Sequence, residues 1–156
     1  MKNSDSGRLV YMNGVYVSEK DAKISIFDSA LMFGDMVFEM TRSFNKKHFK
    51  LKEHLERILY GVKIYRIPLD LDINDLEKIC LETAEKNDKF FGPTDEHRLM
   101  INVSRGPLGI YAPIFNNKIE PTLVVADFPL KWTVASMGKL YDEGINAVLV
   151  NQRAIP

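Results

Sequence analysis

The stretch from Ser29 to Arg57 constrains the fold more than any other part of this sequence. It contains an alternating run, Met36–Phe44, followed by a polar turn at residues 45–47 and a short return, His48–Leu51. Because successive side chains of a strand point to opposite faces, this alternation predicts a β-hairpin. Apolar residues then recur at helical spacing, which predicts a helix that carries Arg57. A strand face beside a helix-borne guanidinium is an arrangement that can line a pocket and hold an anion.

The predicted strand places Phe38, Met40 and Arg42 on one face. We expect them to form an apolar wall with an arginine at its edge. The alternative is a strand that faces the core and carries a surface arginine. For Arg57, the alternative is a solvated charge that pairs with Glu53 one helical turn earlier.

The remaining pattern predicts an α+β fold. Asn13-Gly14 between two apolar runs is a strong hairpin signal, because both residues tolerate positive φ. Two amphipathic helices are expected, with strands before and after them. The first spans residues 51–64, and the second begins after Asp72, whose side chain can cap its free N–H groups, and runs to about Lys86. The other expected elements are strands over 23–27, 98–103, 122–128 and 145–150, a short helix over 137–143, and loops over 28–35 and 106–118.

These elements predict a division of the chain into three parts. We expect a small α+β domain over residues 1–128, an interdomain linker over 129–136, and the start of a second, incomplete domain over 137–156. The predicted strand over 145–150 needs neighbours that nothing after it supplies. We therefore expect the chain to be part of something longer or to need a partner.

Composition excludes several classes of function. Lys+Arg and Asp+Glu are both 21, so the chain lacks the basic excess that nucleic-acid binding needs. It has no apolar run of the roughly 20 residues that span a bilayer and no apolar secretory segment near its start. A single cysteine, Cys80, excludes an internal disulfide and fits a reducing compartment, so we expect a cytoplasmic protein. The histidines and Cys80 show no metal-ligand spacing.

Several short motifs occur together in a particular order. They are Asn13-Gly14, Phe33-Gly34-Asp35-x-Val37-Phe38-Glu39, Glu53-His54-x-x-Arg57, Lys63-Ile64-Tyr65-Arg66-Ile67-Pro68, Arg105-Gly106 and Ala126-Asp127-Phe128-Pro129. In this order the chain resembles the class IV pyridoxal-phosphate enzymes, which include branched-chain aminotransferases, D-amino-acid aminotransferases and aminodeoxychorismate lyases. The resemblance implies the N-terminal small domain of fold type IV, an antiparallel sheet with two helices, followed by the first elements of the large domain.

The resemblance also implies roles for individual residues. Arg57 matches the arginine that binds the phosphate of pyridoxal 5′-phosphate, and Phe38 matches an aromatic wall of the substrate pocket. Met40 replaces a glycine of the branched-chain pattern and should narrow that pocket. Arg98 matches an arginine of the branched-chain enzymes, although Glu96 replaces their nearby tyrosine.

Two further residues match positions at the substrate site. Arg105 matches the strand-end arginine of the D-amino-acid enzymes, whose accompanying histidine has no clear counterpart here. Either Arg98 or Arg105 would clamp a carboxylate or be a surface charge. Trp132 would lie where the family lines its substrate site, or pack as a linker tryptophan.

The family's catalytic lysine follows a segment like Asn151–Pro156, so we assign no catalytic residue to this chain. Three hypotheses follow. The chain is the N-terminal portion of an aminotransferase that uses an amino acid and a 2-oxo acid, it belongs to a lyase of the same family, or it is a non-catalytic module for binding or dimerisation. Family members are commonly homodimers, and residues 106–118 and 122–128 are expected to contribute to such an interface.

Overall fold

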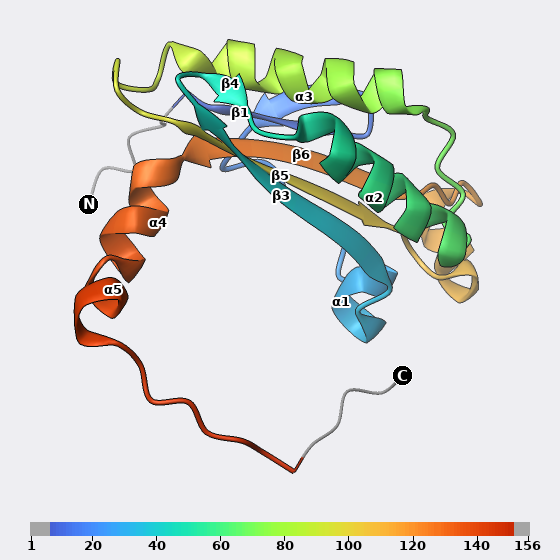
Figure 1. The fold of residues 1–156 in the computed structure, drawn as a ribbon. Coiled ribbons are helices and arrows are strands. Elements are labelled where there is room, and N and C mark those ends of the chain that lie inside the picture. The colour runs from blue at the N-terminus through green and yellow to red at the C-terminus, as the bar shows by residue number, and fades with distance from the viewer. Residues whose placement is uncertain (1–6, 152–156) are drawn as a thin grey trace.

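The structure, a computed structural model, describes residues 7–151. Its centre is a six-stranded sheet in the order β2-β1-β6-β5-β3-β4, with every neighbouring pair antiparallel. Helices α2 and α3 lie together over one face of this sheet (Figure 1). The predicted α+β fold, an antiparallel sheet with two helices, is confirmed. The elements are β1 (Leu9–Met12), β2 (Val15–Ser18), α1 (Ser29–Phe33), β3 (Met36–Phe44), β4 (Lys47–His48), α2 (Leu51–Ile64), α3 (Ile73–Asp88), β5 (His97–Ser104), the 3-10 helix η1 (Gly109–Phe115), β6 (Thr122–Pro129), α4 (Leu130–Met137) and α5 (Lys139–Glu143).

The two long helices bury the apolar stripes that their sequences predict. The Asp72 side chain starts α3 by accepting hydrogen bonds from the backbone N–H groups of Asn74 (2.7 Å) and Asp75 (2.9 Å). Cys80 lies on the buried face of this helix, and burial raises the pKa of its thiol to about 12. The core residues from these helices and the central strands are Leu51, Leu55, Ile58, Val62, Leu76, Cys80, Ala84, Leu99, Ile101, Val103, Leu123 and Val125.

Strand register divides the sheet into a helix-covered face and an open face. On the open face, side chains from β3, β5 and β6 form cross-strand rows. The rows are Arg42–Arg98–Phe128, Met40–Met100–Ala126 and Phe38–Asn102–Val124. Phe38, Met40 and Arg42 therefore share one face, as predicted, and Phe38 is 64% exposed. This face points away from α2 and α3.

The predicted loop over residues 28–35 is wrong, because it contains the short helix α1. The Asp28 carboxylate begins this helix by accepting from the N–H of Ala30 at 2.8 Å. The same carboxylate accepts from the hydroxyls of Ser104 (2.7 Å) and Thr122 (2.6 Å), so two distant strands fix the start of α1. Gly34 ends the helix in the left-handed conformation at φ 68°.

Two predicted strands are wrong. Residues 23–27 form no strand; the adjoining Asp28 makes only an isolated bridge with Pro107. Residues 145–150 also form no strand, and Val148 and Leu149 are 82% and 101% exposed. A strand needs a neighbour for its backbone hydrogen bonds, and the described part of the chain provides none at either segment.

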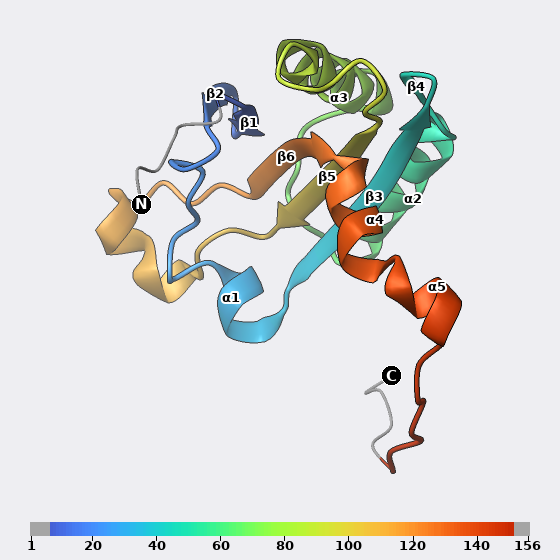
Figure 2. The ribbon, with the colours of Figure 1, turned by 90° about the vertical axis from the view of Figure 1, so that its left-hand side faces the viewer.

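The segment expected as a linker, 129–136, is mostly helix α4, which leaves the end of β6 and leads into α5 (Figure 2). The predicted helix over 137–143 is present as α5. The expected loop over 106–118 contains η1. The division into two domains stays a prediction, and its last residues, 152–156, lie outside the described residues.

Candidate functional site

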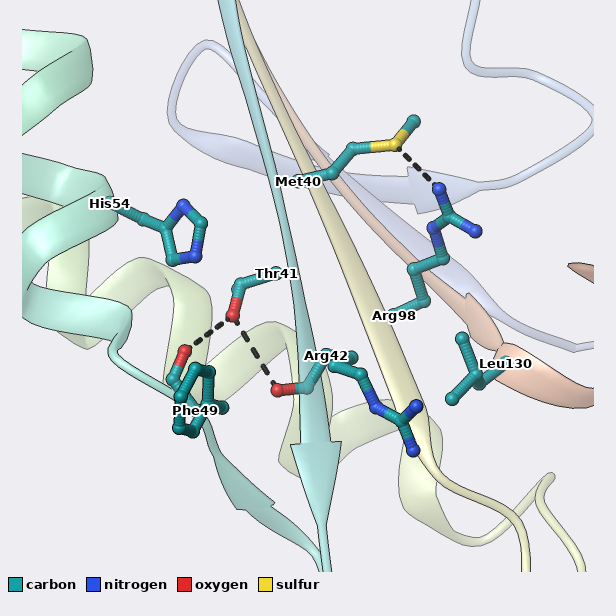
Figure 3. A pocket seen from close by; sticks show the side chains of 7 residues that line it. All are labelled: Met40, Thr41, Arg42, Phe49, His54, Arg98 and Leu130. Atoms are coloured by element: carbon teal, nitrogen blue, oxygen red, sulfur yellow. Dashed lines mark hydrogen bonds between the residues drawn. The ribbon is translucent and has the colours of Figure 1, made fainter.

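A hollow of about 290 Å³ is lined by residues of β3 and of the elements beside it. Figure 3 shows Met40, Arg42, Arg98 and Leu130 on one side of this strand, and Thr41, Phe49 and His54 on the other. The Thr41 hydroxyl donates to the carbonyl of Phe49 at 2.8 Å, which holds the start of α2 against the strand. Three of the sequence-predicted site residues, Met40, Arg42 and Arg98, therefore meet around one hollow.

Two guanidinium groups lie in the same cross-strand row beside this hollow. Arg98 donates from Nη1 to Thr133 Oγ1 at 2.6 Å, and its Nη2 lies 3.2 Å from Met40 Sδ. The Arg42 guanidinium lies 4.0 Å from the centre of the Phe44 ring, and its Nε donates to the Ser43 carbonyl at 3.2 Å. Neither arginine has an acidic partner among the described residues, so this end of the open face carries positive charge.

Arg57 is part of a three-residue cluster centred on Glu39. Glu39 lies on the helix-covered face of β3 and its side chain is 6% exposed. It accepts from Arg57 through both the Nε and Nη2 groups, the latter at 2.7 Å. Its Oε2 also lies 2.8 Å from His54 Nδ1. The hydrogen bond from Arg57 lowers the pKa of the Glu39 carboxyl against the opposing effect of burial, with His54 adding to the lowering.

The donors of Arg57 fit a phosphate. Its side chain is 70% exposed, and the contact with Glu39 engages only the Nε/Nη2 edge of the guanidinium. The end-on Nη1/Nη2 edge can therefore pair with the oxygens of a phosphate dianion. The alternative, in which Arg57 pairs with Glu53, is not what the structure has: Arg57 contacts Glu39, and Glu53 Oε1 lies 3.7 Å from Lys50 Nζ. The role of Arg57 as phosphate ligand stays a prediction.

Arg105 lies apart from the hollow and contacts the chain's own oxygens. Its Nε donates to Asp35 at 2.7 Å, Nη2 donates to the Tyr65 carbonyl at 2.6 Å, and Nη1 donates to the Arg66 carbonyl at 2.9 Å. These contacts fasten the C-terminal end of α2, whose last carbonyls lack helical partners. The carboxylate clamp stays a prediction, and this geometry favours a structural role.

Trp132 lies on α4 at the border of the open face. Its ring stacks on Phe128 at 6.4 Å between centroids, and the Arg8 guanidinium lies 4.4 Å above it. The indole is 48% exposed. Its position beside the Arg42–Arg98–Phe128 row agrees with a residue that borders the substrate site, which stays a prediction.

Sequence reasoning missed the part that Glu39 plays. The signal was available, because alternation places Glu39 on the strand face opposite to Phe38, and one face of a strand in such a fold packs against the core. A carboxylate at such a position needs a cationic or hydrogen-bonding partner, and His54 and Arg57 lie on one side of the following helix. Glu96, which replaces a tyrosine of the branched-chain enzymes, also has a structural part that the sequence did not predict. It accepts from the Ser43 hydroxyl and from the N–H groups of Asn45 and Lys46, which stabilises the β3–β4 turn.

Two general properties of residues 7–151 bear on the kind of site. Within this range, no group of three or more histidine, cysteine or carboxylate side chains is arranged to hold a metal ion. None of the helices in the same range combines the length and the apolar character needed to cross a bilayer.

Comparison with known proteins gives consistent results. Residues 36–156 match the family model "Amino-transferase class IV". The chain is 34% identical over 148 residues to the "Putative branched-chain-amino-acid aminotransferase" of Methanocaldococcus jannaschii, covering 94% of this chain and 47% of that protein. It is 34% identical over 133 residues to the D-alanine aminotransferase of Staphylococcus epidermidis, covering 85% and 42%.

Solved structures share the fold. The branched-chain amino acid aminotransferase from Escherichia coli aligns with a TM-score of 0.65 and 25% identity, covering 79% of this chain and 41% of that one. The chain spans about half the length of the curated relatives it matches. With its α+β architecture and the ordered motifs around Glu39 and Arg57, the chain belongs to the class IV aminotransferase family, whose solved members have the type IV fold.

Proposed function

We propose that this chain supplies the phosphate-binding arginine and one wall of the substrate site in a pyridoxal-phosphate-dependent aminotransferase. The full-length enzyme would transfer an amino group between an amino acid and a 2-oxo acid. The observation that carries this proposal is the hollow at β3, where Met40, Arg42 and Arg98 meet beside the Glu39–His54–Arg57 cluster. The names of the relatives, branched-chain and D-alanine aminotransferases, support the reaction type.

Pyridoxal phosphate, when bound, supplies the electron sink for chemistry at the substrate α-carbon. In the proposed site, Arg57 binds its phosphate through the exposed edge of the guanidinium. The arginine keeps its charge at any working pH, and its contact with Glu39 raises the pKa of the guanidinium further. The role of this chain is therefore to anchor and orient the cofactor from the side of α2.

The open face of the sheet would receive the substrate. Arg42 and Arg98 would attract its carboxylate, since neither cation is neutralised by an acidic side chain of residues 7–151. Phe38 and Met40 would form the apolar wall, bordered by Trp132. Because the Met40 side chain reaches Arg98, it occupies space beside the guanidinium and would restrict the size of the substrate side chain.

We also propose a cytoplasmic homodimer. Of the two segments expected at the dimer interface, β6 is a central strand whose Leu123 and Val125 lie in the core. The loop over 106–118 is the better candidate, because Ile110 and Ile114 of η1 are 76% and 58% exposed. Sedimentation of the full-length protein with and without Ile110→Glu tests this, and an unchanged dimer in the variant would exclude η1 from the interface.

The test of function uses the full-length protein. Incubation with pyridoxal phosphate, borohydride reduction and peptide mapping should locate one modified lysine, outside residues 1–156. A half-reaction screen of L- and D-amino acids, followed by 2-oxo acids, should then give amino-group transfer with one enantiomer. Pyruvate release from aminodeoxychorismate without transfer would replace the proposal by the lyase. No specific lysine modification would favour the non-catalytic module.

A further inference from the structure

Glu39 is the least exposed member of the cluster that contains Arg57. It projects from β3, which pairs with β5 from Met36 to Arg42 and is therefore held in the sheet. Arg57 and His54 project from α2 and both meet this carboxylate. The contact thus joins an exposed side chain of a helix to a fixed point of the sheet.

We propose that Glu39 is a positioning residue that orients Arg57 for phosphate binding, an inference that rests on the proposed function. The carboxylate holds the Nε/Nη2 edge of the guanidinium in a two-point contact. A planar guanidinium held along one edge has its other edge fixed in direction. The Nη1/Nη2 edge is therefore presented outward, where a phosphate can reach it.

The exposure of Arg57 explains why a fixed orientation of its side chain would favour phosphate binding. Its side chain is 70% exposed, so without Glu39 it would be free to adopt many rotamers. Binding an anion would then have to restrict that freedom, which weakens affinity. Because the contact with Glu39 is already present in the free protein, Arg57 loses less conformational freedom when the phosphate binds. This is the arrangement in which a ligand-binding side chain has its rotamer set by a neighbour that the ligand does not touch.

The negative charge of Glu39 would not prevent a phosphate from binding to Arg57, for a geometric reason. Its two oxygens are occupied by Arg57 and His54 on the helix-covered face of β3, with only 6% of the side chain exposed. The phosphate would approach the exposed edge of the guanidinium from the opposite side. His54 holds Glu39 Oε2 at 2.8 Å and so fixes the carboxylate that fixes Arg57.

The experiment measures binding by the full-length apoprotein of pyridoxal phosphate and, separately, of pyridoxal, which lacks the phosphate. The variant Glu39→Gln keeps the shape of the side chain and removes its charge. Glu53→Gln is the matched control, because Glu53 lies on the same helix as Arg57, is 58% exposed and pairs with Lys50 rather than with Arg57. Arg57→Ala and the double variant Glu39→Gln/Arg57→Ala complete the set.

We expect Glu39→Gln to weaken binding of pyridoxal phosphate about tenfold and to leave binding of pyridoxal within about twofold. Glu53→Gln should change neither. Because Glu39 acts through Arg57, the double variant should bind no more weakly than Arg57→Ala alone. A structural fault in Glu39→Gln would instead weaken both ligands together, and that result would overturn the proposal.

Arg57→Lys provides an independent check should Glu39→Gln be unstable. Lysine keeps the charge but lacks the planar fork, so it cannot be oriented by a two-point contact. It should also lose about tenfold in affinity for pyridoxal phosphate. If Arg57→Lys bound pyridoxal phosphate as tightly as the unsubstituted protein, or if Glu39→Gln bound it more tightly, the inference would be overturned. Either result would leave the proposed function standing. No saturable binding by the unsubstituted protein would remove the proposed function, and the inference with it.

Discussion

Two carboxylate–histidine pairs in this molecule have the same geometry in different surroundings. Glu39 Oε2 lies 2.8 Å from His54 Nδ1, and Asp127 Oδ2 lies 2.8 Å from His97 Nδ1. In the first pair, the carboxylate also meets an exposed arginine. In the second, both side chains are buried, at 0% and 4% exposure, and the other ring nitrogen of His97 contacts Asp88 at 3.1 Å. The first arrangement leaves the exposed cation of Arg57 accessible to a ligand, whereas the two side chains of the second pair are both buried.

The surroundings also shift the ionisation of the two carboxylates in opposite directions. The pKa of Glu39 is lowered by its hydrogen bond to Arg57, and the pKa of Asp127 is raised by burial. Burial opposes the charge of His97 too, but the hydrogen bond and charge of Asp127 outweigh it and raise the histidine's pKa. The comparison shows that burial, rather than contact distance, decides which of the two pairs contributes more to the stability of the fold.

The largest effect on stability should come from Asp127→Ala. Removing one member of a buried pair leaves the other without its partner, which typically costs about 3–5 kcal/mol. Urea unfolding of the purified protein measures this change. Glu39→Ala is the comparison, because its cationic partner is solvated, and it should lower stability by less. Equal losses in the two variants would contradict the role given to burial.

The pH dependence of stability should reflect His48, which lies beside His97 with ring centroids 5.7 Å apart. Burial, and then the charge of His97, lower the pKa of His48 to about 4 from its ordinary 6.5. As the pH falls from 6.5 toward 4, the unfolded chain takes up this proton before the folded chain does. Stability should therefore decline over that interval.

His97 should act in the opposite sense at higher pH. Its folded pKa is raised above 6.5, so its stabilising contribution is complete below that value and is lost as the pH rises through the folded pKa. Together the two histidines predict a stability maximum near pH 6.5. Urea titrations at several pH values check this, and His48→Asn should reduce the decline on the acid side. Constant stability between pH 6.5 and 4.5 would exclude the assigned state of His48.

Arg105→Ala should have an intermediate effect, because its ion pair with Asp35 is partly exposed, at 36% and 23%. Losing the hydrogen bonds at the end of α2 should destabilise the protein by about 1–2 kcal/mol. Thermal unfolding and the KM for the amino-acid substrate are measured on the same variant. An unchanged KM supports the structural role, whereas a raised KM with unchanged stability would restore the carboxylate clamp.

Arg57→Ala should lower stability less than Asp127→Ala, since Arg57 is largely solvated and Glu39 keeps its contact with His54. Its effect on the proposed ligand should be large. Loss of a charge-assisted hydrogen bond to phosphate weakens affinity on the order of tenfold to a hundredfold. Spectroscopic titration with pyridoxal phosphate is the measurement. An unchanged titration would remove Arg57 from the cofactor site. The Glu39–His54 and Asp127–His97 pairs would then differ only in how deeply they are buried.

The sequence was sufficient for elements whose pattern is local. α2 and α3 follow from apolar residues at helical spacing and from Asp72 as cap, and β3 follows from strict alternation. α1 could not be found in this way, because its five residues depend on Asp28 contacts with Ser104 and Thr122. The strand predicted over 145–150 failed for the converse reason: its composition suits a strand, but the described residues give it no neighbour.

The site was predictable to a similar extent. Alternation alone places Phe38, Met40 and Arg42 on one face, and the register with β5 then adds Arg98 to the Arg42 row. That Glu39 needs a partner could be predicted from the alternation, but that Arg57 is this partner could not, because the rotation of α2 that places Arg57 over this strand depends on how the helix packs. The same holds for Arg105, whose acceptors at Asp35, Tyr65 and Arg66 come from separate parts of the chain.

The register of the three central strands has a practical consequence for protein engineering. On β3, β5 and β6, the positions on the open face carry even residue numbers and those under the helices carry odd ones. A combinatorial library confined to positions 38, 40, 42, 98, 100 and 102 would vary the chemistry presented to a ligand while leaving the core side chains of the same strands untouched. Recognition and folding can thus be evolved on alternate residues of a single strand.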